Sequence, residues 1–321
     1  MAEKELFEEQ AAQGRLDDAG EFPSVVLLDT TSHCNLRCSM CVHRTMKRKR
    51  GVMAWDLFTK LIDEIALEDP TVRVWMVFFG EALILRRRKP SIFDMLAYAK
   101  RKGLTDVVLN SNLNILEGDD PYRLIESGLD AIYVGIDAAT AETYGKLRVG
   151  GDFNRAVRNV ERLIEAKRER ASEKPGVFVQ FVEMDSNCHE KDDFISYWTA
   201  RGAQVKIRPK VSWGGLIEAS NLVMGPEERW PCYWAMRTMS VTDAGKVVTC
   251  AVDLDAAFIA GDVTLSSMKQ IWNTTLKDLR EKHEAGLFSE LPGICRNCRD
   301  WQSARADYYR QGTGAALSPA Q

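Results

Sequence analysis

The chain has 321 residues, of which 45% are apolar and 28% are charged, and a formal net charge of −3. This length allows one large domain and a smaller one. The slightly acidic balance argues against nucleic acid as a partner, because no surplus of basic side chains is available for phosphates. The sequence contains no uninterrupted run of about 18 apolar residues, so we expect no membrane span. The acidic N-terminus lacks the pattern of a secretion signal, and we expect a cytoplasmic protein.

After a polar lead-in over residues 1–22, the hydrophobic pattern predicts alternating strands and helices. The expected strands are Ser24–Thr30, Val72–Phe79, Asp106–Asn110, Ala131–Ile136, Val177–Val182 and Ala203–Arg208. The expected helices are Trp55–Leu67, Ile92–Lys102, Tyr122–Glu126, Asn154–Arg168 and Lys191–Ala200. Six β/α units predict an α/β fold, in which a parallel sheet curls into a partial barrel over residues 23–215. In such sheets the chemistry lies at the C-terminal ends of the strands.

Residues 216–321 follow a different pattern and predict a small second domain. We expect a hairpin with strands at Thr238–Thr242 and Val247–Cys250 and a turn at Ala244–Gly245. A helix over Met268–Glu284 then precedes a cysteine-rich end.

Three of the eight cysteines lie together just after the first expected strand, as Cys34, Cys38 and Cys41. In a cytoplasmic chain, clustered cysteines indicate metal or redox chemistry rather than disulfides. Three thiolates can ligate three irons of a [4Fe–4S] cube and leave the fourth iron open. The alternative is a zinc site completed by His33 or His43, but zinc prefers four closed ligands.

This C-x3-C-x2-C loop resembles the signature of the radical S-adenosylmethionine (SAM) superfamily. The resemblance implies that SAM chelates the open iron and is cleaved to a 5′-deoxyadenosyl radical, which abstracts hydrogen from a substrate. The cofactor then supplies the chemistry, while the protein orients the reactants and excludes water.

Two strand ends extend the resemblance. Gly80 and Glu81 stand where the family carries its GGE motif, with Phe79 in place of the first glycine, and would hold the SAM ammonium. Asn110 and Ser111 resemble the segment that contacts the SAM ribose. The alternative for Asn110 and Ser111 is an ordinary strand-end turn.

The segment after the fourth expected strand resembles a further family stretch, through Asp137, Tyr144 and Arg148. By this resemblance Asp137 faces the site and Arg148 pairs with the SAM carboxylate, for which a guanidinium group is well suited. The alternative for Arg148 is a solvated charge at a helix end.

The second cysteine group resembles the SPASM and twitch extensions of radical SAM enzymes. It consists of Cys232, Cys250, Cys295 and Cys298, whereas Cys188 lies alone and has no expected role. Four thiolates suffice for one fully ligated auxiliary [4Fe–4S] cluster, which would then transfer electrons. The cysteine spacing resembles that of the aminocyclitol alcohol dehydrogenases of antibiotic biosynthesis. A four-cysteine zinc ribbon is the alternative.

The last barrel strand alternates apolar residues with Lys206, Arg208 and Lys210, which predicts a basic barrel lumen. Such a lumen favours a substrate with a carboxylate or phosphate, or assistance with the SAM carboxylate, although Lys210 can reach solvent at the strand end. An oxidised alcohol needs a base for its hydroxyl proton, and the candidates are Glu183, Lys206 and Arg208.

Two basic runs, Arg44–Arg50 and Arg86–Lys89, stand out in this acidic chain. They are either solvated loops or a docking rim for an acidic electron donor such as flavodoxin or ferredoxin.

The sequence therefore favours oxidation of a secondary alcohol on a small sugar, aminocyclitol or nucleoside-like metabolite. The alternatives are maturation of a ribosomally made peptide, and a redox-neutral epimerase or decarboxylase. A metal-binding protein without catalysis would need no SAM pocket, and the motifs at the strand ends speak against it.

Overall fold

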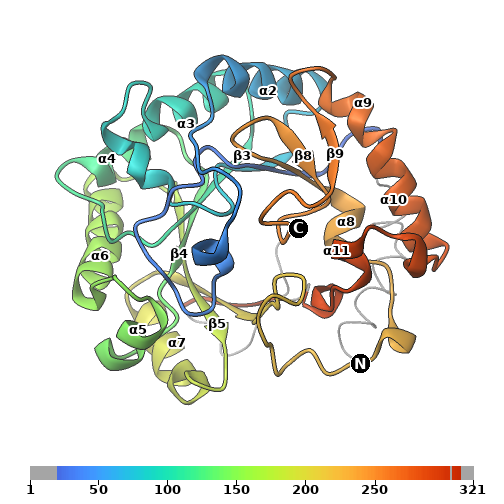
Figure 1. Cartoon of the computed structure of the whole chain (residues 1–321). Helices are drawn as coiled ribbons and strands as arrows, with labels where there is room; N and C mark the ends of the chain where they lie inside the picture. The colour runs from blue at the N-terminus through green and yellow to red at the C-terminus, as the bar shows by residue number, and fades with distance from the viewer. Residues whose placement is uncertain (1–19, 304–305, 312–321) are drawn as a thin grey trace.

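The computed structural model describes residues 20–303 and 306–311 (Figure 1). Within them, six parallel strands alternate with helices, which confirms the expected α/β architecture. The strands are β1 (Val25–Leu28), β2 (Arg73–Trp75), β3 (Asp106–Ser111), β4 (Ala131–Gly135), β5 (Gly176–Glu183) and β6 (Gln204–Pro209). The helices between them are α2 (Trp55–Glu68), α3 (Ile92–Arg101), α4 (Asp120–Glu126), α5 (Ala141–Leu147), α6 (Phe153–Glu169) and α7 (Lys191–Ala200).

The C-terminal part adds shorter elements. Its strands are β7 (Thr238–Val241), β8 (Lys246–Val248), β9 (Ile259–Asp262) and β10 (Asp307–Tyr309). Its helices are α8 (Tyr233–Arg237), α9 (Met268–Trp272), α10 (Thr275–Glu284) and α11 (Gly293–Arg296). Short 3-10 helices lie at Val42–Thr45, Ala82–Arg87, Cys188–Glu190, Pro226–Glu228, Phe288–Glu290 and Asp300–Gln302.

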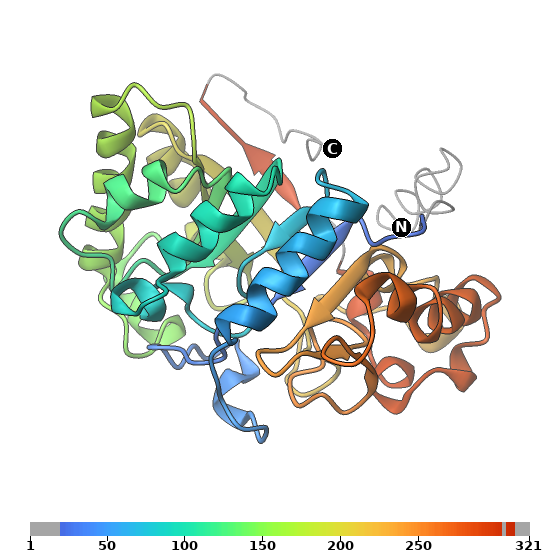
Figure 2. The ribbon, with the colours of Figure 1, turned by 90° about the horizontal axis from the view of Figure 1, so that it is seen from above.

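All ten strands form one sheet, in the order β10-β6-β5-β4-β3-β2-β1-β7-β8-β9. The neighbours from β1 to β6 are parallel, and β7 also pairs parallel to β1. The expected hairpin is thus present as β7 and β8, and it extends the barrel sheet. Figure 1 shows the barrel helices in an arc around the strands, with the C-terminal segment on the remaining side, and Figure 2 shows this segment beside the barrel from above.

The core follows from strand alternation, because successive side chains point to opposite faces of a sheet. Val74, Val107 and Ile132 are fully buried in the main hydrophobic core. The residues at the alternate positions point into the lumen, where aromatic rings from β2, β4, β5 and β10 contact one another. Trp75, Tyr133, Phe178 and Tyr308 form this aromatic layer, with ring centroids 4.6 to 6.0 Å apart between successive rings.

Several features differ from the expectation, among them strand β9 and the length of β2, which is shorter than the expected strand Val72–Phe79. The helix over Met268–Glu284 is divided into α9 and α10, because Asn273 and Thr274 leave the helical conformation. Helix α5 was not expected, although the Thr140 side chain caps its first turn by accepting from the Thr143 amide. Strand β10 was not expected either, and it pairs antiparallel with β6.

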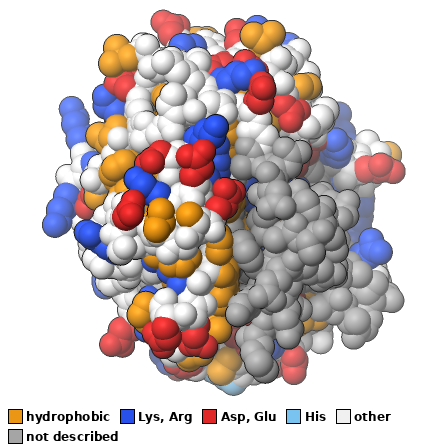
Figure 3. Space-filling model, turned by 90° about the vertical axis from the view of Figure 1, so that its right-hand side faces the viewer, with side chains coloured by type: hydrophobic (Ala, Val, Ile, Leu, Met, Phe, Trp, Pro, Cys, Tyr) orange, Lys and Arg blue, Asp and Glu red, His pale blue; other side chains and the backbone are white. Residues whose placement is uncertain are grey.

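None of the helices in the described ranges combines the length and apolar character that crossing a lipid bilayer requires. On the face shown in Figure 3, acidic and basic side chains are interspersed, in keeping with a net charge near zero.

Candidate active site

Cys34, Cys38 and Cys41 lie in the loop between β1 and α2. Their side chains are buried or half-buried and close enough for their charges to interact. Burial and the charge of Glu81 raise the pKa of Cys34 to about 12. Thiols in such a setting need a bound cation to become thiolates, and iron would supply that charge.

The backbone of the cysteine loop is held by the end of α5. The Arg37 amide donates to the Val149 carbonyl at 2.9 Å, and the Ser39 amide donates to the Leu147 carbonyl at 2.8 Å. These bonds place Arg148 directly beside the cysteines, although more than 100 residues separate them in the chain.

Gly80 lies where two backbones approach closely. A Cβ atom at this position would lie 2.0 Å from the Thr31 carbonyl oxygen and 2.8 Å from that of His33. The following amide, of Glu81, donates to the His33 carbonyl at 2.8 Å. Only glycine therefore allows this segment to run against the chain that leads into Cys34.

The Glu81 side chain is 1% exposed and joins the ends of two strands. Its carboxylate accepts from the Leu83 amide at 3.1 Å, the Ser111 hydroxyl at 2.9 Å and the Asn112 amide at 2.7 Å. Burial raises the pKa of Glu81, and these hydrogen bonds oppose the shift. Asn110 directly precedes Ser111 in β3 and lies on the lumen face. Its side-chain oxygen Oδ1 accepts a hydrogen bond from Gln180 Nε2 at 2.9 Å.

Asp137 and Arg148 form a buried ion pair beside the cysteine loop. Arg148 Nε donates to Asp137 Oδ2 at 2.6 Å, and its Nη1 lies 3.6 Å from Cys38 Sγ. Burial lowers the pKa of Arg148, but the charges of Asp137 and Cys38 outweigh burial and raise it. Gly135 makes room for the guanidinium, because a Cβ atom there would lie 2.1 Å from Arg148 Nη2.

Lys206 is half-buried in the lumen, next to the aromatic layer. Its ammonium lies 4.9 Å from the Tyr133 ring centroid, 5.5 Å from that of Tyr308 and 6.0 Å from that of Trp75. Burial, together with the charges of Arg208 and Arg73, lowers the pKa of Lys206 to about 7. A lysine with this pKa can exchange protons near neutral pH.

The other two candidate bases, Arg208 and Glu183, lie on opposite faces of the sheet. Arg208 lies on the lumen face and interacts electrostatically with Asp137, Arg148 and Cys41. Glu183 points to the same face of the sheet as the core residue Phe181, away from the lumen, and its carboxylate binds Lys191 of α7 at 2.7 Å. The structure thus groups Lys206 with Arg208 and leaves Glu183 apart from both.

The four cysteines of the second group line one cavity in the C-terminal part. Burial raises the pKa of Cys295 to about 12, and burial also raises the pKa values of Cys232, Cys250 and Cys298. Among the described residues, no three His, Cys, Asp or Glu side chains lie as close together as ligands of a single metal ion do. The four thiols instead surround a common cavity.

Polar atoms without partners face the same cavity. Arg229 Nε is buried and has no hydrogen-bond partner among the described residues, and the buried Thr249 hydroxyl interacts only with the Cys295 thiol. His283 Nδ1 accepts from the Cys232 amide at 3.4 Å. These donors, beside four thiols, fit an anionic iron–sulfur cluster, because buried polar groups otherwise require partners.

The sequence motifs did not single out Gln180 or Trp213 as site residues. The sequence indicated only which face of its strand Gln180 occupies. In the structure its side chain reaches from β5 across β4 to bond Asn110 of β3. Trp213 Nε1 donates to the Met40 carbonyl, within the cysteine loop, at 2.8 Å. The unusual Trp-Gly-Gly segment was the only sequence signal for it.

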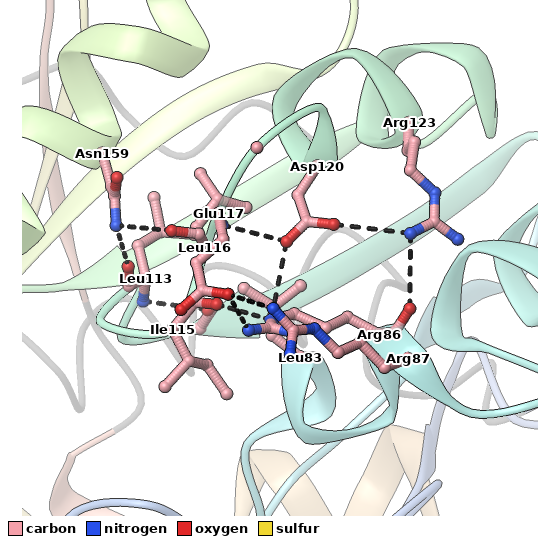
Figure 4. A network of polar contacts seen from close by, with 12 residues as sticks. Leu83, Arg86, Arg87, Leu113, Ile115, Leu116, Glu117, Asp120, Arg123 and Asn159 are labelled. Carbon is pink, nitrogen blue, oxygen red and sulfur yellow. Dashed lines mark hydrogen bonds and ion pairs between the residues drawn. The ribbon is translucent and has the colours of Figure 1, made fainter.

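The two basic runs are partly internal. Arg48 is buried in an ion network with Asp29 and Asp243. Figure 4 shows Arg86 and Arg87 joined to Glu117, with Arg86 also donating to the Ile115 carbonyl. Arg44, Lys47 and Lys49 of the first run, and 87–89 of the second, stay exposed.

This constellation, a cysteine loop at the open end of a partial barrel and a separate four-cysteine cavity, defines a class of enzyme. Residues 28–178 match the radical SAM superfamily, and residues 232–299 match the iron–sulfur cluster-binding SPASM domain. The chain is a radical SAM enzyme with a C-terminal SPASM domain. These domains imply a SAM-binding [4Fe–4S] cluster and an auxiliary iron–sulfur cluster, for which the cysteines described above are the protein ligands available.

Among curated relatives, the chain is 27% identical over 177 residues to the tungsten-containing aldehyde ferredoxin oxidoreductase cofactor-modifying protein of Pyrococcus furiosus. That alignment covers 53% of this chain and 46% of the relative, so the chain spans about half the length of this relative. It is 24% identical to the mycofactocin maturase MftC of Mycobacterium ulcerans, over 88% of this chain and 82% of the relative.

Solved structures share the fold. BtrN, in complex with AdoMet and 2-DOIA, superposes with a TM-score of 0.61 at 17% identity, covering 86% of this chain and 93% of BtrN. SuiB of Streptococcus suis, bound to the precursor peptide SuiA, gives a TM-score of 0.67 at 11% identity, covering 85% of this chain and 70% of SuiB.

Proposed function

We propose that this enzyme oxidises a secondary alcohol of a small polar metabolite to a ketone, with the auxiliary cluster as electron acceptor. The four-cysteine cavity carries this proposal. Four protein ligands leave no iron open to substrate, so electron transfer is the remaining task of the cluster. A redox-neutral reaction has no use for such an acceptor.

The chain's own residues divide the work at the SAM site. SAM on the reduced cluster supplies the 5′-deoxyadenosyl radical that takes the carbinol hydrogen atom. We assign Gly80 and Glu81 to the SAM ammonium, because the buried carboxylate lies at the entry to the cysteine loop. We assign Asn110 and Ser111 to contacts with the ribose of SAM.

We assign Asp137 and Arg148 to the carboxylate of SAM. Arg148 uses Nε and Nη2 for Asp137 and directs one N–H of Nη1 at Cys38 Sγ, so we assign the second N–H of Nη1 to the SAM carboxylate. Asp137 fixes the guanidinium in that orientation through a second bond, from the Val182 amide at 2.7 Å.

The oxidation also releases a hydroxyl proton and one further electron. We assign the proton to Lys206, whose pKa of about 7 leaves a neutral amine available at neutral pH. An auxiliary cluster held by Cys232, Cys250, Cys295 and Cys298 would accept the electron. The substrate thus loses one hydrogen atom, one proton and one electron, which completes a two-electron oxidation.

Anaerobic incubation of the reconstituted enzyme with SAM, a reductant and candidate sugars or aminocyclitols tests the proposal. We expect a product two mass units lighter and one deoxyadenosine per turnover. A product of unchanged mass that contains solvent deuterium would instead establish epimerisation. The C298A variant is the sharper control, since it should still cleave SAM but accumulate no ketone.

The second candidate is modification of a ribosomally made peptide. It is supported by the alignment with the mycofactocin maturase, which spans 88% of this chain, and by the fold shared with peptide-bound SuiB. Mass spectrometry of peptides encoded beside the gene, after incubation with enzyme and SAM, separates the two candidates.

We further propose a cytoplasmic location, where thiols stay reduced, and an acidic electron donor such as flavodoxin or ferredoxin. The exposed residues Arg44, Lys47 and Lys49 lie on the loop that follows the cysteines and suit such a donor.

A further inference from the structure

The lumen face contains two cations that no acidic side chain neutralises. Arg208 and Lys206 occupy successive inward positions of β6. Arg73, by contrast, binds Asp106 at 2.7 Å, and Arg148 binds Asp137. Among the charged lumen residues that the structure describes, the two on β6 therefore carry the uncompensated charge.

Arg208 has a carboxylate nearby, but that carboxylate is already committed. Asp137 Oδ2 accepts from Arg148, and Asp137 Oδ1 accepts from the Val182 amide. Within the described ranges, Arg208 itself makes no hydrogen bond or ion pair. A half-buried guanidinium carries five donors, and those of Arg208 are available to an acceptor from outside the chain.

Lys206 is surrounded by rings and by other cations. Trp75, Tyr133 and Tyr308 face its ammonium, and cation–π contacts of this kind stabilise a charge without cancelling it. Its charged neighbours on β6 and β2 are Arg208 and Arg73, which repel it. The tyrosine hydroxyls bond to each other, which leaves Lys206 without an anionic partner among the described residues.

We propose that Arg208 and Lys206 form an anion-binding site within the barrel, which binds a carboxylate or phosphate group of the substrate. The guanidinium group suits either anion through paired hydrogen bonds. Lys206 adds a point charge on the same strand in its protonated form, whereas its neutral form is the base assigned above. Calling the anion a substrate group rests on the proposed function, whereas the binding site itself does not. The substrate class is then an acidic or phosphorylated sugar-like metabolite.

Two other anions are near enough to compete. One is the carboxylate of SAM, which Arg148 receives in the assignment above. The other is the cluster with its thiolates, since Arg208 interacts electrostatically with Cys41. The test therefore measures anion binding, SAM binding and cluster potential separately.

The experiment is anaerobic isothermal titration of the holoenzyme with inorganic phosphate and with acetate, without reductant so that SAM stays intact. Each anion is titrated with and without saturating SAM. The variants are Arg208→Gln and Lys206→Met. The matched control is Arg201→Gln, which removes a half-exposed arginine bound to Glu161 on the outer surface. Iron content and circular dichroism verify that each variant is loaded and folded.

We expect saturable binding of phosphate to the SAM-loaded enzyme. Arg208→Gln should weaken it roughly tenfold or more and Lys206→Met severalfold, while SAM affinity stays within about twofold and Arg201→Gln behaves as wild type. Absence of saturable binding of both anions to wild type overturns the proposal, whatever the variants do.

Competition between phosphate and SAM, with weaker SAM binding in Arg208→Gln, would assign the site to the SAM carboxylate instead. If Arg208→Gln shifts the reduction potential of the cluster at Cys34, Cys38 and Cys41 but leaves phosphate binding unchanged, Arg208 acts on that cluster rather than on a bound anion. Phosphate binding without ketone formation would refute alcohol oxidation and leave the anion site standing.

Discussion

Arg48→Met should destabilise the enzyme strongly, because Arg48 joins the barrel to the C-terminal part through two buried carboxylates. Its Nη2 lies 2.6 Å from Asp29 Oδ2, and its Nη1 lies 2.5 Å from Asp243 Oδ1. The Asp29 side chain is fully buried, and that of Asp243 is 6% exposed. Removing the cation leaves Asp243, and Asp29 wherever it is ionised, without a partner charge, which costs about 3–5 kcal/mol.

For a chain of this size, that loss corresponds to a Tm about 4–7 °C lower. The assay is thermal unfolding of the anaerobic holoenzyme at a fixed scan rate. The matched control is Arg44→Met, which removes an exposed arginine from the same loop and should leave Tm nearly unchanged.

The pH dependence of this penalty has a definite sign. Burial raises the pKa of Asp29 from 3.8 to about 7, against the opposing effect of Arg48. Without Arg48 the pKa of Asp29 rises further, so the folded variant protonates Asp29 at pH 6, and the loss of Tm should be smaller at pH 6 than at pH 8. Equal Tm values for Arg48→Met and Arg44→Met, or a larger penalty at pH 6, would refute the reasoning.

Three further outcomes are expected. Gly135→Ala should push Arg148 from its place and weaken SAM binding roughly tenfold by equilibrium dialysis with iron content unchanged, whereas Gly145→Ala, which meets open space, should not. Lys206→Met should raise the free energy of unfolding by about 1–3 kcal/mol at pH 6, and Tm with it, because wild type buries an ammonium whose pKa is lowered from 10.5 to about 7. The gain should shrink as the pH rises from 7 toward 10, and a gain that does not depend on pH would contradict this cause. Arg229→Gln should lower the potential of the auxiliary cluster by tens of millivolts in an EPR-monitored redox titration, because a buried cation favours the reduced cluster, and an unchanged potential would mean that Arg229 does not act on it.

Local sequence was enough for the barrel and the cysteine loops. Strand-length apolar runs and helical periodicity located β1 to β6, and C-x3-C-x2-C is a short-range spacing that needs no tertiary information. The lumen orientation of Lys206 also followed from strand parity alone. The same parity separates Glu183 from the lumen, because it lies two positions after the core residue Phe181.

Long-range pairing could not be read in the same way. The parallel pairing of β7 with β1 joins Thr238 to Val25, and nothing local in either strand specifies the other. Strand β10 has only three residues, yet it brings Tyr308 opposite Lys206 and so completes the aromatic layer. The ion pair of Asp137 and Arg148 likewise depends on Gly135, whose role is visible only once the guanidinium lies against β4.

The segment after β6 physically connects the two cysteine sites. Trp213, at φ +54°, donates its indole N–H to the Met40 carbonyl in the first cysteine loop. The next amide, of Gly214, donates to Asp300 Oδ2 at 2.8 Å, and the Asp300 amide in turn donates to Cys298 Sγ at 3.3 Å. A non-glycine residue keeps a left-handed conformation only where its surroundings demand it. Hydrogen bonds rather than a flexible linker therefore hold the auxiliary site at a fixed place relative to the SAM site, as an acceptor must be if it is to take an electron from a substrate in the barrel.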